Sequence, residues 1–561
     1  MKNSKKLAII TLLVCLMFGC STNSSHLGQN NNDNNSSFSI GTEMLVEYDK
    51  DRNQSSDTDA EPVTDSSTSE SVSLAPTCMP VLSIETKKQT GDIMSFVTEP
   101  VSQYVAESIA SWTPGYHMPP TPYYEGCYVT LTDTDNTLLL DTVEANVKVR
   151  GNWTTAYDKK PLRIKFSEKQ NMLGLNNGAQ IKNWVLLAGY KDGSLLRDKT
   201  ALSIAREILS EDGLYAADAQ FVEVEINHQY WGVYLLTELQ QVNQNRIDIT
   251  ENGKDYTGTD IGYFMEFDGY FCNEEPLQQF YVDYSDNAPL IPFDGNEGSG
   301  RTITCLGEGD GDYKQDIGIT IKSDINSQEQ HDFIESYINN VYRIMYAAAY
   351  NDEAYQFTPD FSSIMMTNDI TPQEAVENVV DVQSLADMYI ISELTCDADI
   401  YWSSFFMDAD FGPDGSKRLT FEAPWDFDSS MGNKDRCADA EGFYAANIVP
   451  DVNDVYETIN PWLAVLMYED WFRDIISEKW TAAYDSGIFR RGIEQIMIDS
   501  EQFSSAFDRN YQKWNNIINN NAFAGELCYD SQKCRTHAEA AEYLEKWLSD
   551  RVDFLNNYWH E

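Results

Sequence analysis

The segment FEAPWDFDSSMGN, residues 421–433, carries two carboxylates, Asp426 and Asp428, between an apolar run and a small-residue turn. If the run is a β-strand, its period of two points both carboxylates to one face and Phe427 to the other. Hard divalent cations favour paired carboxylate oxygens, and a phosphate-bound Mg²⁺ typically takes one or two of them from the protein. A solvated acidic turn is the alternative, although a hydrated loop has little use for so many apolar neighbours. The segment therefore predicts a metal site.

The charge of the chain excludes two classes of partner. Its 561 residues include 39 basic and 90 acidic side chains, which give a formal net charge of −51 at pH 7. Nucleic acids and anionic membrane surfaces are polyanions that such a chain repels. The length is sufficient for a large core and for more than one compact unit.

The N-terminus has the parts of a secretory signal. Three lysines among the first six residues precede an apolar run, residues 7–18, that is too short for a permanent transmembrane helix. The run ends in LMFGC, which resembles the lipobox of bacterial lipoproteins and makes Cys20 the expected lipidated residue. Residues 1–20 are predicted to be a lipoprotein signal peptide, with ordinary secretion as the alternative. Residues 21–75 are rich in Ser, Asn, Asp and Thr and are predicted to be a disordered tether.

The cysteines predict disulfides in an exported protein. Without Cys15 and Cys20, eight of the ten cysteines remain, and no C-x-x-C motif suggests a zinc site. An even number of exported cysteines favours disulfides, although the sequence does not give their connectivity. Cys528 and Cys534 are predicted to pair because a bond between them closes a short loop.

A basic, strand-rich region follows the tether. Residues 80–166 contain several alternating runs typical of β-strands. Arg150, Gly151 and Asn152 stand where one strand breaks into a loop. Glycine allows a close backbone approach to a ligand, and nearby cations can neutralise phosphate. The following cations are Lys159, Lys160, Arg163 and Lys165. The region therefore predicts a polyanion pocket, and a hairpin with an exposed basic strand is the alternative.

Further elements alternate before a helical region. Residues 194–209 have the apolar spacing of a helix, and residues 221–239 read as a hairpin whose second strand ends at Glu238. A short strand in 261–270 precedes a Gly- and Asp-rich insertion at 273–316. From residue 324 onward amphipathic helices dominate. One of these helices runs into a loop that holds Asp397 and Asp399.

These motifs, taken together and in order, resemble the CotH family, the atypical protein kinases similar to spore coat protein H. The resemblance covers residues 80–560 and rests on the ordered set of motifs. The matching stretches are VRGNWTT, KKPLRIKF, NWVLLAGYKDGSLLRDKTA, FVEVEINHQYWGVYLLTELQQVNQNRIDI, IGYFMEFD, DIYWSSFFMDAD, PWDFDSSMGN and EYLEKWLSDRVDFL.

The resemblance implies an α+β protein with a divergent bilobal protein-kinase-like fold. The kinase-like domain is expected at 76–560. Its strand-rich N-terminal lobe is expected at 76–270, inserted loops at 271–323 and a helix-rich C-terminal lobe at 324–560. The implied activity is transfer of phosphate from ATP to exported or surface proteins, with Mg²⁺ or Mn²⁺ as cofactor. A lipid anchor at the cell surface or in the periplasm is the implied location.

The resemblance also assigns roles to residues. Asp399 is the expected catalytic aspartate, and Asp426, with Asp428 beside it, the expected metal ligand. Nucleotide contacts are expected from the loop Arg150, Gly151 and Asn152, from Lys160, Arg163 or Lys165, and from Glu238 at the inter-lobe connection. Ordinary kinases have a metal-binding Asn five residues after the catalytic Asp, and this chain has Ser404 there.

Several alternatives remain open on the sequence alone. Asp397, two residues from Asp399, is a second candidate for the working carboxylate. A catalytically silent surface or adhesion module with the same fold is one alternative function. A hydrolase with paired carboxylates such as Asp399 and Asp426 is another, although it leaves the basic strand without a role.

Overall fold

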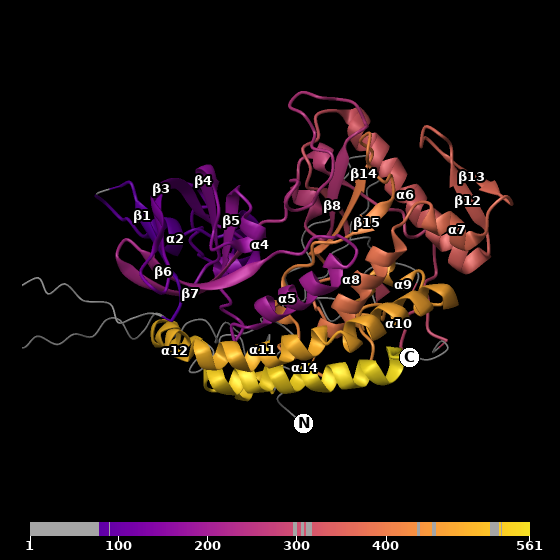
Figure 1. The fold of residues 1–561 in the computed structure, drawn as a ribbon. Helices are drawn as coiled ribbons and strands as arrows, with labels where there is room; N and C mark the ends of the chain where they lie inside the picture. The colour runs from indigo at the N-terminus through magenta and orange to yellow at the C-terminus, as the bar shows by residue number, and fades with distance from the viewer. Residues whose placement is uncertain are drawn as a thin grey trace, which may run out of the picture. The chain divides into compact units, whose positions relative to one another are not determined.

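The computed structural model describes most of the chain from residue 78 to the C-terminus (Figure 1). The described residues are 78–88, 90–295, 300–303, 308–309, 317–434, 438–450, 456–516, 527–528 and 530–561. The predicted signal peptide, Cys20 and the predicted tether at 21–75 lie outside these residues.

A closed seven-stranded barrel forms the N-terminal part, with strand order β1-β2-β3-β4-β5-β7-β6. Neighbouring strands are antiparallel except β1 and β6, whose parallel register from Val81↔Glu223 to Ile84↔Ile226 closes the barrel. The strands are β1 Val81–Thr86, β2 Glu125–Thr132, β3 Leu138–Val149, β4 Leu162–Gln170, β5 Ile181–Leu187, β6 Ala219–Ile226 and β7 Gln229–Glu238. The sequence predicted these strands individually, but not their closure.

Alternating apolar residues explain why these segments are strands. In β2 every second residue is buried, and in β4 Leu162, Ile164 and Phe166 are buried while Lys165 is exposed. A period of two places one set of side chains inside the barrel and the other set outside. The cationic residues of β3 and β4 therefore stand on the outer face of the barrel.

Short helices lie between the strands of the barrel, and one longer helix packs against the C-terminal part of the protein. The helices of this part are α2 Ser95–Thr98, α3 Gln103–Trp112, α4 Leu175–Gly178 and α5 Arg197–Ser210, with a 3₁₀ turn, η2, at Trp153–Ala156. α5 packs against α8 and α11. Its buried residues, among them Leu202, Ala205 and Leu209, belong to the same core as the C-terminal helices. α5 therefore joins the two parts of the molecule.

A five-stranded antiparallel sheet begins the C-terminal part, in the order β15-β14-β8-β11-β9. Its strands are β8 Gly262–Asp268, β9 Gln279–Phe280, β11 Gly318–Ile321, β14 Phe405–Asp410 and β15 Leu419–Phe421. β8 pairs with β14, as in Phe267↔Phe405, and has no partner in the barrel among the described residues. The barrel thus ends at Glu238, before the lobe boundary expected near residue 270. β11 lies within the segment expected to be inserted loops.

Helices make up most of the remainder. They are α6 Gln328–Asn351, α7 Pro372–Glu377, α8 Val382–Thr395, α9 Pro461–Ala464, α10 Asp470–Asp485, α11 Ile488–Gln502, α12 Ser504–Lys513 and α14 His537–Trp559. Short 3₁₀ turns are η3 Phe271–Asn273, η4 Pro276–Gln278, η5 Phe427–Ser429 and η7 Ser531–Lys533. Small strands are β10 Glu308–Gly309, β12 Ala354–Phe357, β13 Ile364–Thr367, β16 Val449–Pro450 and β17 Tyr456–Thr458. Among the described residues no helix is both long and apolar enough to cross a membrane. The mixed α+β class is confirmed.

The predicted Cys528–Cys534 disulfide is wrong. Both residues are free thiols, as are Cys78 and Cys127. The thiol of Cys528 is buried and donates to the carbonyl oxygen of Gly432 at 2.8 Å. Cys534 follows the η7 turn, where its sulfur lies 3.6 Å from the carbonyl oxygen of Glu539. Sequence proximity suggested a bond, but the turn directs the two sulfurs to different partners.

Candidate active site

Three carboxylates from two separate loops lie close together. Asp426 and Asp428 are in the loop after β15, and Asp399 is in the loop after α8. One carboxylate oxygen from each of Asp399, Asp426 and Asp428 lies within 4.8 Å of the other two. The expected strand geometry of Asp426 and Asp428 is wrong, because β15 ends at Phe421 and Asp426 has a left-handed backbone, φ 71°. Aspartate adopts this conformation more easily than most residues. The turn brings together the carboxylates that strand alternation was expected to align.

Asp198, at the start of α5, contacts the loop after β15, residues 422–433, which is called the metal loop after the predicted metal site. The backbone N–H of Phe427 donates to its carboxylate at 3.0 Å. The phenyl ring of Phe427 is buried, and Ser430 Oγ donates to the Phe427 carbonyl oxygen at 2.6 Å. The segment between the two carboxylates is thus fixed by a helix that packs on both parts of the protein. No motif in the sequence pointed to Asp198.

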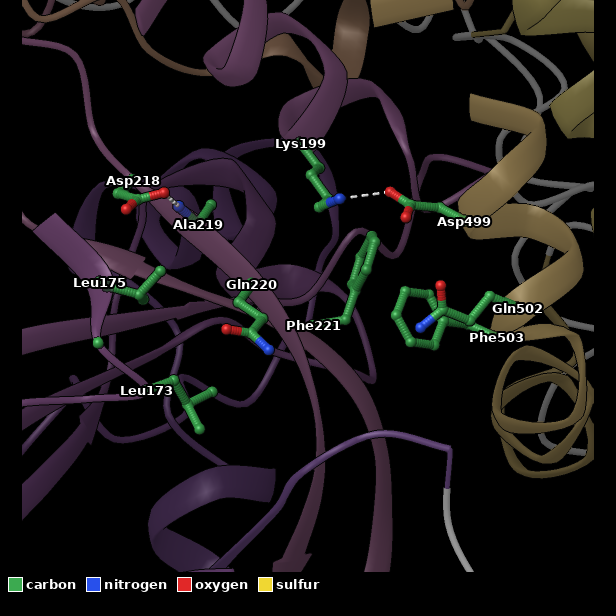
Figure 2. A pocket seen from close by; sticks show the side chains of 11 residues that line it. Leu173, Leu175, Lys199, Asp218, Ala219, Gln220, Phe221, Asp499, Gln502 and Phe503 are labelled. Carbon is green, nitrogen blue, oxygen red and sulfur yellow. Dashed lines mark hydrogen bonds and ion pairs between the residues drawn. The ribbon is translucent and has the colours of Figure 1, made fainter. Parts of the chain in front are cut away.

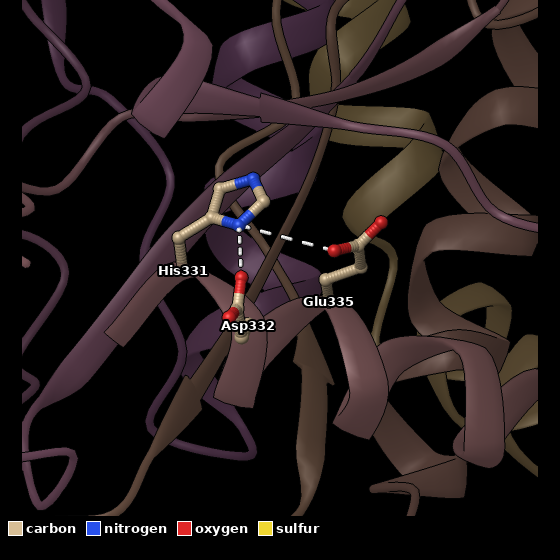
Figure 3. A group of neighbouring side chains, drawn as sticks. All are labelled: His331, Asp332 and Glu335. Carbon is tan, nitrogen blue, oxygen red and sulfur yellow. Dashed lines mark hydrogen bonds and ion pairs between the residues drawn. The ribbon is translucent and has the colours of Figure 1, made fainter. Parts of the chain in front are cut away.

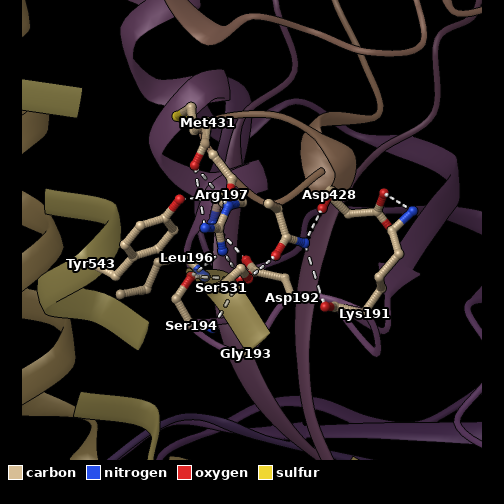
Figure 4. A network of polar contacts seen from close by, with 12 residues as sticks. Lys191, Asp192, Gly193, Ser194, Leu196, Arg197, Asp428, Met431, Ser531 and Tyr543 are labelled. Atoms are coloured by element: carbon tan, nitrogen blue, oxygen red, sulfur yellow. Dashed lines mark hydrogen bonds and ion pairs between the residues drawn. The ribbon is translucent and has the colours of Figure 1, made fainter. Parts of the chain in front are cut away.

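Lys191 is a second functional candidate that the sequence analysis missed. Its ammonium lies 3.1 Å from Asp428 Oδ1 (Figure 4). It also donates to Ser429 Oγ at 2.5 Å. Lys191 is buried to nine-tenths, in the turn after β5. Its position in the GYKDGS stretch, two residues from each of two glycines, was the available signal. Without the fold, nothing related that turn to a loop more than two hundred residues later.

A buried network supports the end of the metal loop (Figure 4). The Arg197 guanidinium, with about 1% of its surface exposed, pairs with Asp192 and donates to the backbone oxygens of Ser430 and Met431. From α14, the Tyr543 hydroxyl donates to the Gly432 carbonyl oxygen at 2.8 Å. Buried charged groups require such partners because desolvation is costly. The network fixes the loop backbone rather than supplying reactive groups.

The electrostatics of the carboxylate cluster favour a cation. Burial raises the pKa of Asp426 to about 7, and the charges of Asp428 and Asp399 contribute to that rise, while Lys191 and Arg150 oppose it. Like charges in a shared site raise a carboxyl pKa because both cannot easily be ionised. A hard divalent cation relieves this repulsion, and all three groups offer the oxygen ligands it prefers.

Asp397 and Asp399 both lie in the loop after α8, but their surroundings differ. Asp397 is buried, and burial together with the charge of Asp399 raises its pKa well above the usual value. Its carboxylate accepts the Asp399 N–H at 3.0 Å. Asp399 is half-buried and shares the cluster with Asp426 and Asp428. Asp397 therefore shapes the loop, whereas Asp399 faces the other carboxylates.

Ser404 ends this loop with a left-handed backbone, φ 63°. Its N–H donates to Glu266 Oε1 on β8 at 2.8 Å, and Glu266 Oε2 lies 2.6 Å from the Lys322 ammonium. The neighbouring sheet thus fixes the loop through Glu266. Both oxygens of that carboxylate already have partners.

The loop Arg150, Gly151 and Asn152 lies opposite the carboxylates. The Arg150 guanidinium carbon is 5.5 Å from the centre of the Trp425 ring, one residue before Asp426. Burial lowers the pKa of Arg150, and the charge of Asp426 opposes that shift. Gly151 has φ 97°, and a Cβ there would lie 2.4 Å from the hydroxyl oxygen of Thr154. Glycine is required at this turn for both reasons.

Lys148 and Arg163 add to the positive charge beside Arg150. They are directly paired across β3 and β4. Burial lowers the pKa of Lys148, and Arg163 and Arg150 lower it further. Among the carboxylates of the described residues, none forms an ion pair with Lys148, Arg150 or Arg163. In a chain of net charge −51, three neighbouring cations without an internal counterion indicate a site for an anion.

Lys148, Arg150 and Arg163 together form a cationic face, and Arg163 also links this face to the connection after β7. Its guanidinium donates to Asn183 Oδ1 at 3.0 Å, and Asn183 Nδ2 donates to Gln241 Oε1 at 3.1 Å. Polar contacts therefore run from the loop of Arg150, Gly151 and Asn152, called the Gly151 loop, to the segment between the barrel and β8.

Three other predicted nucleotide residues have different surroundings. The Lys160 ammonium is buried and donates to the carbonyl oxygens of Thr155 and Tyr157, at 2.6 and 2.9 Å, so it stabilises the turn after Gly151. Its burial lowers its pKa to about 8. Lys165 is exposed on the outer face of β4.

Glu238, the third of these residues, is fully buried, and both of its carboxylate oxygens have partners. Oε1 accepts hydrogen bonds from Arg246 Nε at 3.1 Å and Asn176 Nδ2 at 2.9 Å, and Oε2 accepts from the Asp218 N–H at 3.1 Å. Glu238 therefore has a structural role in this connection, and its nucleotide contact stays a prediction.

A separate cluster lies at the start of α6 (Figure 3). His331 Nδ1 is 3.1 Å from Asp332 and 3.8 Å from Glu335, and His331 Nε2 is 2.8 Å from the carbonyl oxygen of Gln279. Each contact is an ordinary ion pair or hydrogen bond of a helix N-terminus, so the cluster has a structural explanation.

The cavity in Figure 2 has a volume of about 440 Å³ and lies between β6, α5 and α11. The Lys199–Asp499 ion pair borders it, together with Phe221 and Phe503. It contains none of the carboxylates or cations described above. The cavity and the candidate active site are therefore separate features.

A comparison with known families agrees with these motifs. The sequence model of the CotH kinase protein family matches residues 147–555. The match spans most of the chain, and the protein belongs to the CotH kinase family. It includes the Gly151 loop, Lys191 and all three carboxylates of the cluster. No curated protein sequence matches the chain at a significant level.

Proposed function

We propose that this protein is an exported kinase that transfers the terminal phosphoryl group of ATP to hydroxyl groups of surface or secreted proteins. In this proposal the barrel and the helix-rich part are the two lobes of a divergent protein-kinase-like fold, and the segment after Glu238 connects them. Membership in the CotH kinase family supports the activity class.

One observation carries the proposal: a cationic face without an internal counterion lies beside a three-carboxylate cluster. The charge of Asp426 opposes the fall in the Arg150 pKa, and the charge of Arg150 opposes the rise in the Asp426 pKa, so the two groups lie near enough to influence each other without forming an ion pair. Phosphoryl transfer depends on positioning and on charge neutralisation. A metal–nucleotide complex, with anionic phosphates and a bound cation, complements both halves of this site.

Each group has a role in that reaction. Arg150, Lys148 and Arg163 neutralise phosphate oxygens, while Gly151 lets the loop backbone approach them. Asp426 and Asp428 hold a divalent cation, which when bound supplies further charge neutralisation at the phosphates. Asp399 accepts a hydrogen bond from the acceptor hydroxyl and orients it. Ser404, in place of an amide ligand, leaves the second cation of ordinary kinases with fewer protein ligands.

The location and the acceptor are part of the same proposal. Export, with a lipid on Cys20 as the membrane anchor, rests on the LMFGC motif and the preceding apolar run. An exported kinase acts on proteins at the cell surface or in the periplasm, and ordinary secretion is the alternative.

Thermal unfolding of the full chain with ATP and Mn²⁺ tests this function. A ligand that binds the folded state raises its apparent stability. We expect a higher melting temperature with both ligands together, and a much smaller rise for Asp426→Asn. No shift in the unaltered protein would contradict the nucleotide site and favour a silent surface module. A shift with Mn²⁺ alone, to which ATP adds nothing, would favour a metal-dependent hydrolase.

A further inference from the structure

The helix α3 contacts both loops of the proposed site, although it precedes the region matched by the family. The family match begins at residue 147, and α3 spans Gln103–Trp112. Ser102 caps α3 by accepting the Val105 N–H. Its hydroxyl also donates to Asn152 Oδ1 at 2.9 Å, and its N–H donates to Thr155 Oγ1 at 2.9 Å. The start of α3 is therefore bonded to the Gly151 loop on two sides.

Tyr104, in the first turn of α3, reaches the other loop. Its ring centre lies 5.1 Å from that of Tyr270 in an edge-to-face arrangement, and Tyr270 lies 5.9 Å from Trp402 in the same arrangement. The backbone N–H of Trp402 donates to the Asp399 carbonyl oxygen at 2.8 Å. A continuous set of contacts thus runs from Asn152 through α3 to the proposed catalytic aspartate.

Backbone contacts fix Trp402 and Tyr270, the aromatic residue on which Tyr104 packs. The Gly269 N–H donates to the Trp402 carbonyl oxygen at 2.6 Å, and a Cβ on Gly269 would lie 2.2 Å from the Trp402 ring. The Tyr270 N–H donates to Asp268 Oδ1 at 2.8 Å. Tyr270 and Trp402 are therefore held by backbone contacts, and Tyr104 docks on a fixed partner.

We infer that α3 is a clamp that sets the position of the Gly151 loop relative to Asp399. This inference rests on the proposed function and adds positioning residues outside the matched region. Ser102 orients the loop and Tyr104 orients α3, and neither group is assigned a contact with a substrate. Misplacement by about 1 Å can slow an enzymatic step by about 100-fold, so a clamp on loop position affects the reaction step more than binding.

Backbone hydrogen exchange of the full chain without ligands tests the clamp independently of activity. Tyr104→Ala removes the aromatic contact, and Ser102→Gly removes the hydroxyl while retaining a residue that is tolerated as a helix cap. We expect faster exchange at the Trp402 and Ser403 amides in Tyr104→Ala. In Ser102→Gly we expect faster exchange at Thr155. Tyr104→Phe keeps the ring, and Gln103→Ala alters a neighbouring exposed residue that bonds only within α3. Both controls should match the parent protein.

Steady-state phosphate transfer gives the second readout. Tyr104→Ala is expected to lower kcat about three- to tenfold, the range that one aromatic pair carries, with KM for ATP changed less than about twofold. Tyr104→Phe should restore kcat. Unchanged exchange at Trp402 and Ser403 in Tyr104→Ala, with unchanged kcat in both test variants, would overturn the clamp. If the parent protein transfers no phosphate, the proposed function fails, and the exchange data alone decide whether α3 couples the loops.

Discussion

The ammonium of Lys191 lies 3.1 Å from Asp428 Oδ1, so the turn after β5 supplies a cation to the metal loop. Both side chains are largely buried, at 11% and 12% exposure. Asp428 is therefore neutralised before a divalent cation binds, and the incoming cation competes with a lysine already in place.

Lys191→Met should bind Mn²⁺ more tightly than the parent protein in the absence of nucleotide. Removing a cation near the cluster leaves the carboxylates more negative, and a change of about three- to tenfold in affinity is expected for a partly buried charge. Calorimetric titration measures it, and Lys191→Arg, which keeps the charge, is the matched control. Equal or weaker Mn²⁺ binding by Lys191→Met would show that the lysine does not compete for the site.

Lys148→Gln and Arg163→Gln should weaken ATP binding without weakening adenosine binding. Each removes one cation from a face with no internal counterion, and removal of a charge-assisted hydrogen bond to phosphate costs about tenfold in affinity. Competition binding with the two ligands separates phosphate recognition from base recognition. Lys169→Gln, at the exposed end of β4, is the control. An equally weakened affinity for adenosine would place these residues at the base instead.

Asp426→Asn should stabilise the metal-free fold above neutral pH. The pKa of Asp426 is raised to about 7, whereas an unfolded aspartate titrates near 3.9. Between these values the folded state binds more protons, so ionisation of Asp426 lowers stability as pH rises from about 4 to about 7, and the full cost persists above that range. Asp426 is partly exposed, and solvent screening reduces the effect. We therefore expect a gain in the free energy of unfolding of about 1 kcal/mol at pH 8 and a smaller gain at pH 5.

Urea unfolding with a chelator present measures the effect of Asp426→Asn at both pH values. The exposed Asp474→Asn is the control for a generic loss of negative charge. A gain at pH 5 that equals the gain at pH 8 would contradict the raised pKa.

Cys20→Ser should release the protein from the membrane fraction. A covalent lipid, rather than a spanning helix, is the proposed anchor, and stable attachment needs its acyl chains. Cell fractionation followed by immunoblotting checks this outcome, with Cys15→Ser within the same apolar run as the control. An unchanged membrane fraction for Cys20→Ser would rule out the lipid anchor.

The sequence predicted the local elements of the fold better than their closure. Alternation in segments such as 125–132 predicts a strand directly, because burial repeats with the backbone period. The parallel pairing of β1 with β6, which closes the barrel, depends on contacts between residues about 140 positions apart. Alternation within one strand contains no information on that partner. For the same reason the pairing of β8 with β14 could not be predicted from the sequence.

The same limit applies to the candidate site, where local proximity could be predicted but contacts between distant segments could not. The proximity of Asp426 and Asp428 could be predicted from their spacing, although a left-handed turn rather than a strand produces it. The family resemblance implied nucleotide contacts for Glu238 and Lys160, and the structure places both side chains against internal partners. Lys191 and Asp198 were missed because their relevance appears only when the turn after β5 and the start of α5 pack beside the metal loop.

Phosphate transfer from labelled ATP with Mn²⁺, to the protein itself and to a generic protein acceptor, tests the central claim most directly. We expect transfer by the full chain. Asp426→Asn should lose both transfer and metal-dependent ATP binding, whereas Asp399→Asn should lose transfer and keep nearly parental ATP binding. Asp397→Asn should have a mild effect. Full transfer activity in both Asp399→Asn and Asp426→Asn would contradict the assignment of this site, and no transfer by the unaltered protein would contradict the kinase function.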